Sequence, residues 1–123
     1  MGPVDWTAVA ASWLVAAALG VAFYGRAAMP RRGALALHTL AALLLLASVT
    51  MIGHMFARVG AGTLQDKPWL YFMMAGGLAL TFIGPAMVIT AIRRGRFVAD
   101  ALYDAAYWLA TFLSVGAVFW LQG

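Results

Sequence analysis

Acidic and hydroxyl side chains recur along one stretch near the C-terminus of this sequence, and they are the first candidates for chemistry. Asp100, Asp104, Tyr107 and Thr111 are separated by three or four positions, so they share one face if this stretch is helical. Two aspartates with no histidine nearby in sequence do not form a hydrolytic site. The pattern therefore predicts a polar helix face, led by Asp104, that either forms ion pairs or lines a path for a proton or cation.

Arginines in two short basic segments are the expected ion-pair partners of these carboxylates. Arg26 and Arg31 lie in the first segment, and Arg93 and Arg94 lie in the second. If the segments end at the same depth as the aspartates, a structural Asp–Arg pair competes with the proton or cation relay as the role of Asp104. Both interpretations stay open from the sequence.

A second group of side chains could bind a soft metal. Met51, His54 and Met55 share one face of a predicted helix, and Met73 is expected at a similar depth. Thioether and imidazole ligands suit Cu(I), although methionine also fills gaps between apolar helices. His38 and His54 lie about 24 Å apart along a helix, so they cannot bind one haem together. We expect no cofactor, with copper or haem as alternatives.

The composition places all of these residues in a membrane protein. Apolar residues make up 65% of the 123 residues, charged residues only 10%, and the mean hydropathy is +0.92. A soluble domain usually has about a quarter charged residues. Four apolar runs are long enough to cross a bilayer as helices, at about 6–24, 34–56, 69–92 and 98–121. Short connections predict an all-α, antiparallel up-down bundle of four transmembrane helices in one domain.

Arginine placement predicts the orientation of this bundle. Six arginines lie in the first and third connections, whereas the middle connection has only Arg58 and Lys67 as basic residues. The positive-inside rule then puts both termini outside a bacterial inner membrane. Trp6, Trp69 and Trp120 would all lie at the outer interface. Because the basic residues cluster in these connections, the net charge of +4 does not predict nucleic-acid binding.

Small residues at helical spacing predict close helix packing. Ala8, Ser12, Ala16 and Gly20 recur at every fourth position of the first span. Gly77 and Thr81 form one row of the third span, and Gly76 and Gly84 lie on a neighbouring row. These rows are expected to pack helices within a protomer or between protomers. Pro85 is expected to kink the third span.

The ends of the chain resemble a family of small bacterial membrane proteins, domain-of-unknown-function family 1761. The resemblance rests on an aromatic start and a small-residue helix, and on a basic turn before an Asp-x-x-Tyr segment and a final tryptophan: Trp6, Gly20, Phe23-Tyr24, Arg93-Arg94, Asp104-Ala105-Ala106-Tyr107 and Trp120. It implies a four-helix fold and gives Asp104 and Tyr107 added weight. The family has no established activity, so the resemblance implies no reaction.

The sequence therefore predicts a non-enzymatic membrane protein. We expect an accessory or structural subunit that packs in the lipid bilayer with itself or with a larger membrane complex. One alternative is a small oligomeric transporter or channel for a solute, cation or proton, with the polar face of the fourth span lining the path. A second alternative is a haem or Cu(I) carrier that uses His54 and the nearby methionines.

Overall fold

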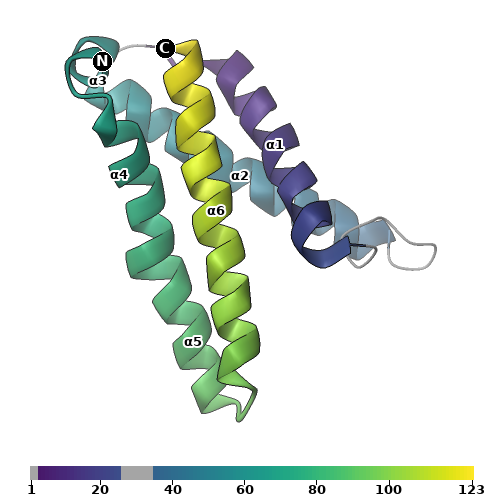
Figure 1. Cartoon of the computed structure of the whole chain (residues 1–123). Coiled ribbons are helices and arrows are strands. Elements are labelled where there is room, and N and C mark those ends of the chain that lie inside the picture. Colours follow the sequence, from purple (N-terminus) through teal and green to yellow (C-terminus); the bar gives the residue numbers. More distant parts are fainter. Residues whose placement is uncertain (1–2, 26–34) are drawn as a thin grey trace.

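The computed structural model describes residues 3–25 and 35–123, and this part of the chain is helical without strands (Figure 1). Two long helices, α1 (Trp6–Tyr24) and α2 (Leu35–Val59), come first. A short helix, α3 (Ala61–Asp66), precedes α4 (Trp69–Leu78), the π-helical segment η2 (Ala79–Ile83) and α5 (Gly84–Arg93). The last helix is α6 (Val98–Gln122).

Among the described residues, four helices are long and apolar enough to cross a membrane, with α4, η2 and α5 counted as one continuous span from Trp69 to Arg93. The prediction of an all-helical chain with four helices able to span a membrane is therefore confirmed for the described residues. The observed bounds differ by a few residues from those expected. The main difference lies in the middle connection, because α2 continues to Val59 and α3 takes up most of the remaining segment.

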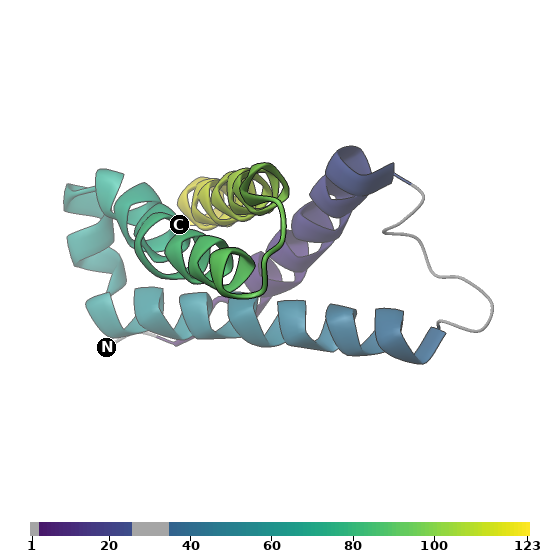
Figure 2. The ribbon, with the colours of Figure 1, turned by 90° about the horizontal axis from the view of Figure 1, so that it is seen from below.

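Helix α6 is the centre of the arrangement. It packs against α1 on one side and against α4, η2 and α5 on the other. Helix α2 departs from the expected alignment, because it crosses behind α6 at a steep angle and its N-terminal half extends away from α4, α5 and α6 (Figures 1 and 2). The Trp13 side chain ties α2 to α1 by donating from Nε1 to the carbonyl oxygen of Ala42, at 3.1 Å.

The main apolar core lies where the C-terminal half of α2 meets α4 and α6. Val49, Ile52 and Val115 are fully buried there. The Phe56 ring contacts the rings of Tyr71 and Phe119, with centroids 5.0 and 5.1 Å away. Such tilted and edge-on aromatic pairs add to the stabilisation that close packing provides.

The small-residue row of the first span lies inside the molecule. Ala8, Ser12, Ala16 and Gly20 are all buried, on a helix that packs mainly against α6 and also against α2. The absence of large side chains lets the helix backbones approach closely, which favours helix association in lipid.

The third span packs through a different row from the one formed by Gly77 and Thr81. A Cβ added at Gly76 would lie 2.6 Å from Cδ2 of Leu113 on α6, so Gly76 makes a close contact. A Cβ at Gly77 would meet nothing within 4 Å, and Thr81 is exposed, with its hydroxyl donating to the Gly77 carbonyl at 2.5 Å. Gly77 and Thr81 therefore do not pack helices within the protomer, and their expected packing between protomers stays a prediction.

Pro85 acts on the third span through a π turn. The N–H of Gly84 donates to the carbonyl of Ala79, five residues earlier. Proline has no N–H, and its ring clashes with the carbonyl four residues before it, so a widened turn just ahead of it accommodates both effects. This turn places Gly84 against α6, where an added Cβ would lie 3.5 Å from the Cβ of Ala105.

Candidate functional site

The end of α1 is fastened to α6 by two tyrosine hydroxyls. The hydroxyl of Tyr24 donates a hydrogen bond to Oδ1 of Asp104. The hydroxyl of Tyr103 donates to the carbonyl oxygen of Phe23, at 2.6 Å. The carboxylate of Asp104 is thus held through one of its oxygens by the neighbouring helix, in a half-buried position. A hydrogen bond to an ionised group is among the stronger kinds in proteins.

Aromatic rings surround this pair of hydrogen bonds. The Phe23 ring lies 5.5 Å from the rings of both Tyr103 and Tyr107. The Tyr24 ring lies 5.1 Å from that of Tyr107 and 5.9 Å from that of Tyr103. These are tilted or edge-on contacts, the geometry that aromatic pairs prefer. We call these four rings together with Asp104 the α1–α6 clasp.

Deeper along α6, the polar face is buried rather than open. Tyr107 is 8% exposed and Thr111 is 0% exposed. The Thr111 hydroxyl has no hydrogen-bond partner in the described part of the chain, and the same is true of Ser12 on α1. A buried hydroxyl without a partner costs about 1–3 kcal/mol. Ser48 and Ser114, by contrast, donate to the carbonyl four residues earlier in their helices.

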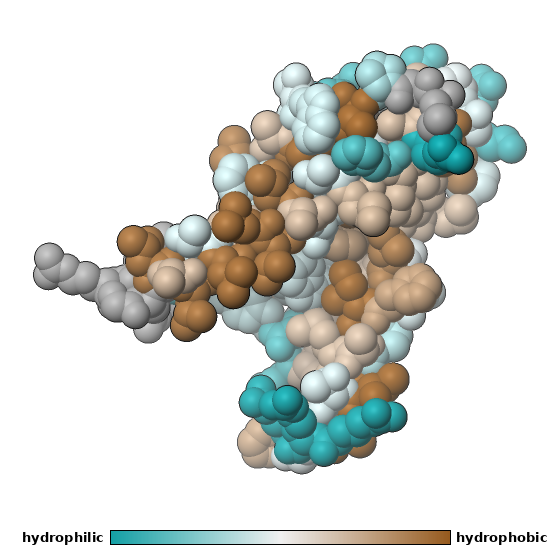
Figure 3. Space-filling view, turned by 180° about the vertical axis from the view of Figure 1, so that it is seen from behind, coloured by the Kyte–Doolittle hydropathy of each residue, from teal (hydrophilic) through white to brown (hydrophobic). Residues whose placement is uncertain are grey.

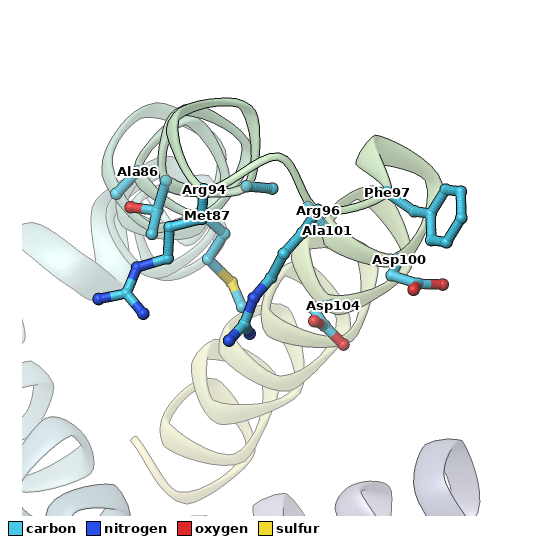
Figure 4. A pocket seen from close by; sticks show the side chains of 10 residues that line it. Ala86, Met87, Arg94, Arg96, Phe97, Asp100, Ala101 and Asp104 are labelled. Carbon is cyan, nitrogen blue, oxygen red and sulfur yellow. The ribbon is translucent and has the colours of Figure 1, made fainter.

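A groove of about 570 Å³ opens beside the clasp, between α5 and α6. Arg94 and Arg96 come from the end of α5 and the turn that follows, and Asp100 and Asp104 project from α6 (Figure 4). Gly95 shapes this turn, because its φ of 67° favours a residue without a Cβ. The remaining lining is mostly apolar, from Ala86, Met87, Thr90, Ala91, Phe97 and Ala101.

The expected Asp–Arg ion pairs are not formed in the described part of the chain. Neither Arg93 nor Arg94 pairs with Asp100 or Asp104 there, and Asp104 bonds to Tyr24. Arg26 and Arg31 lie outside the described residues. Four charged side chains therefore line one groove without neutralising each other directly.

The candidate metal ligands lie at another place, towards the α2–α4 end of the molecule. Met51, His54 and Met55 line a pocket of about 590 Å³ together with Met74, whereas Met73 is exposed and does not line it. Nδ1 of His54 lies 2.8 Å from the carbonyl of Thr50, a contact that leaves Nε2 free as an acceptor if Nδ1 carries the proton. The copper alternative stays a prediction, with Met74 as the methionine from the third span.

Sequence reasoning placed Tyr103 on the polar face of the fourth span but missed Tyr24 and Arg96 as members of the site. Spacing along α6 identified the face that carries Asp104, but spacing within one helix does not identify the residue that meets it from another. A signal was present for Tyr24, because it is a polar aromatic residue at the end of a mostly apolar span. Arg96 lies in the same basic turn as the arginines that were selected.

No family model matches this chain, and neither a curated protein nor a solved structure matches it. The resemblance to domain-of-unknown-function family 1761 therefore stays a prediction.

Proposed function

We propose that this chain is a non-enzymatic, multi-pass protein of the bacterial inner membrane that works by packing against partner transmembrane helices. The partner is a second copy of the chain or a subunit of a larger membrane complex. The observation that carries this proposal is the outward face of the third span, where Gly77 and Thr81 form a small-residue row that no helix in the described part of the protomer covers.

The protomer's own contacts support this interpretation of the outward face. The close contacts inside the protomer use Gly76, Gly84 and the buried row of α1. Small residues at a spacing of four favour helix association in lipid because they let two backbones approach. Gly77 and Thr81 have that spacing but remain on the surface, beside the exposed side chains of Met73 and Leu80. We call these four residues the open face of the third span.

The projecting half of α2 supports the same proposal. Its leucines are widely exposed, as shown by Leu37 at 71% and Leu44 at 60%. Apolar side chains cover this arm in the view from behind (Figure 3). Lipid covers such leucines as well as protein does, so they are compatible with a partner but do not select one. The proposal therefore rests on the open face, and the exposed leucines of α2 offer additional apolar surface to a partner.

The proposed orientation follows from the basic residues. Arg93, Arg94 and Arg96 gather at the α5–α6 turn, which is hydrophilic in the space-filling view (Figure 3). The positive-inside rule places this turn in the cytoplasm and both termini outside, with neighbouring helices antiparallel. The clasp and the groove then lie near the cytoplasmic surface of the membrane.

The transporter or channel alternative has less support from the geometry. A path along α6 would need Asp104, Tyr107 and Thr111 to line one continuous space. Instead, the groove reaches Asp104, and Tyr107 and Thr111 are buried. We therefore rank this alternative second.

A pull-down and a native mass measurement in mild detergent test the proposal. The chain is expected to appear as a defined oligomer or with a stoichiometric membrane partner. Gly77→Leu should reduce that association, because a large side chain would separate the backbones. Ala10→Leu is the matched control, since Ala10 is exposed on α1, away from the open face.

A strictly monomeric chain without partners would contradict the proposal. So would equal association of the Gly77→Leu and Ala10→Leu variants with the original chain. Circular dichroism of both variants would show that they remain folded.

A further inference from the structure

The groove between α5 and α6 has charges of both signs on its walls. Arg94 and Arg96 line it from the end of α5 and the following turn, and Asp100 and Asp104 line it from α6. Figure 4 shows Arg96 and Asp104 in the middle, with Arg94 to the left of Arg96 and Asp100 to the right of Asp104. These arginines and aspartates form no ion pair with each other in the described part of the chain. One oxygen of Asp104 is bonded to Tyr24, and the other has no hydrogen bond from the residues that the structure describes.

This charge pattern selects the type of ligand. A simple anion would pair with the two arginines and be repelled by the two carboxylates. A simple cation would pair with the carboxylates and be repelled by the arginines. In a zwitterion, a phosphate group can pair with the arginines while an ammonium group pairs with the aspartates. Guanidinium groups bind phosphate through paired hydrogen bonds, and an ammonium group donates up to three hydrogen bonds to carboxylates.

The apolar part of the lining indicates that the ligand also carries hydrocarbon. Met87, Ala101 and Phe97 line the same groove, and Phe97 is 80% exposed at the start of α6. The third span ends at Arg93, and the fourth span, formed by α6, begins at Val98. The groove thus lies where the hydrocarbon layer gives way to the headgroup layer, if these helices cross a bilayer as their length and composition allow.

We propose that this groove binds the headgroup of phosphatidylethanolamine, with the phosphate at Arg94 and Arg96 and the ammonium group at Asp100 and Asp104. The volume of about 570 Å³ falls within the range of small-molecule sites, roughly 300–1,000 Å³. The upper acyl chains lie along Met87 and Phe97. This site is independent of the open face of the third span, so it does not rest on the partner that the chain binds there.

Lipid retention in native mass spectrometry tests the proposal. The full chain, purified in detergent, is titrated separately with phosphatidylethanolamine, phosphatidylcholine and phosphatidylglycerol of identical acyl chains. Phosphatidylethanolamine is expected to bind about tenfold or more tightly than the other two lipids. Phosphatidylcholine lacks the N–H donors that the carboxylates accept, and phosphatidylglycerol lacks the cation.

Matched variants locate the site. Arg94→Gln with Arg96→Gln, and separately Asp100→Asn, should each weaken phosphatidylethanolamine binding about tenfold. Arg93→Gln is the control, because Arg93 belongs to the same basic segment but does not line the groove. Phosphatidylethanolamine should bind that control like the original chain. Circular dichroism and the unfolding temperature would confirm that each variant is folded.

Three results would overturn the proposal. The first is equal binding of phosphatidylethanolamine and phosphatidylcholine. The second is an equal loss of binding in the Arg93→Gln control. The third is competition by water-soluble phosphoethanolamine at the same concentration as the lipid, which would show a site for a free zwitterion rather than a lipid.

Discussion

The hydrogen bond between Tyr24 and Asp104 is the most direct test of the clasp. Tyr24→Phe removes the donating hydroxyl and keeps the ring contacts, and Asp104→Asn removes the charge with little change in shape. A hydrogen bond to a charged group contributes about 1.5–3 kcal/mol. Because both side chains are half-buried, we expect the lower end, so Tyr24→Phe should lower the free energy of unfolding by about 1.5 kcal/mol.

A double-mutant cycle separates this bond from other effects of the two substitutions. Unfolding is followed by tryptophan fluorescence during titration of the detergent-solubilised protein with a denaturing detergent. The coupling between Tyr24→Phe and Asp104→Asn should reach about 1 kcal/mol, above the roughly 0.3–0.5 kcal/mol within which independent sites add. Ser114→Ala is the control, because the Ser114 hydroxyl bonds within α6 to the carbonyl of Ala110, away from the clasp, and should not couple to Asp104. Strict additivity of the two substitutions would refute the clasp.

Three further predictions follow from other parts of the fold. Thr111→Val should raise the free energy of unfolding by about 1 kcal/mol, since it replaces a buried hydroxyl that has no hydrogen-bond partner among the described residues with a methyl group of similar size; a loss of stability in the same denaturation assay would show that the hydroxyl is paired. Gly116→Ala should cost about 1–3 kcal/mol, because the new Cβ would lie 2.7 Å from the Tyr71 carbonyl oxygen of α4, whereas Gly77→Ala should leave monomer stability unchanged, and equal effects would contradict the packing described for the two glycines. The sequence has no cysteine, so an impermeant maleimide should label Gln65→Cys in intact cells and Phe97→Cys only after permeabilisation; the reverse pattern would refute the orientation.

The spans could be predicted from sequence, whereas the tilt of α2 could not. Length and hydropathy decide whether a helix crosses a bilayer, and they agree with the observed helices. The angle between helices depends on which side chains meet. Leucines such as Leu37 and Leu44 suit lipid and protein equally, so they carry no information about a neighbour. The leucine-rich half of α2 therefore gave no sequence signal from which its steep crossing angle could be predicted.

The choice between two small-residue rows of the third span could not be predicted from the sequence either. The sequence shows both Gly76 and Gly77 at helical spacing from other small residues. The two rows differ by one position, about 100° around a helix, and composition does not say which one faces α6. The structure selects Gly76, where Leu113 approaches, and leaves Gly77 open. The polar face of α6 was recognised in the same way, but its partner Tyr24 comes from a distant part of the chain.

Asp104 belongs to both the clasp and the groove, so substitutions can separate its contribution to stability from the lipid binding proposed above. Tyr24 holds one of its oxygens from α1, and the α5–α6 groove is open to the same side chain. An aspartate that served only the clasp could be replaced by asparagine at the cost of one charge-assisted hydrogen bond. An aspartate that also binds an ammonium group could not, because the amide has no charge to offer. Asp104→Asn should therefore weaken phosphatidylethanolamine binding about tenfold, whereas Tyr24→Phe should reduce stability and leave the lipid preference in place.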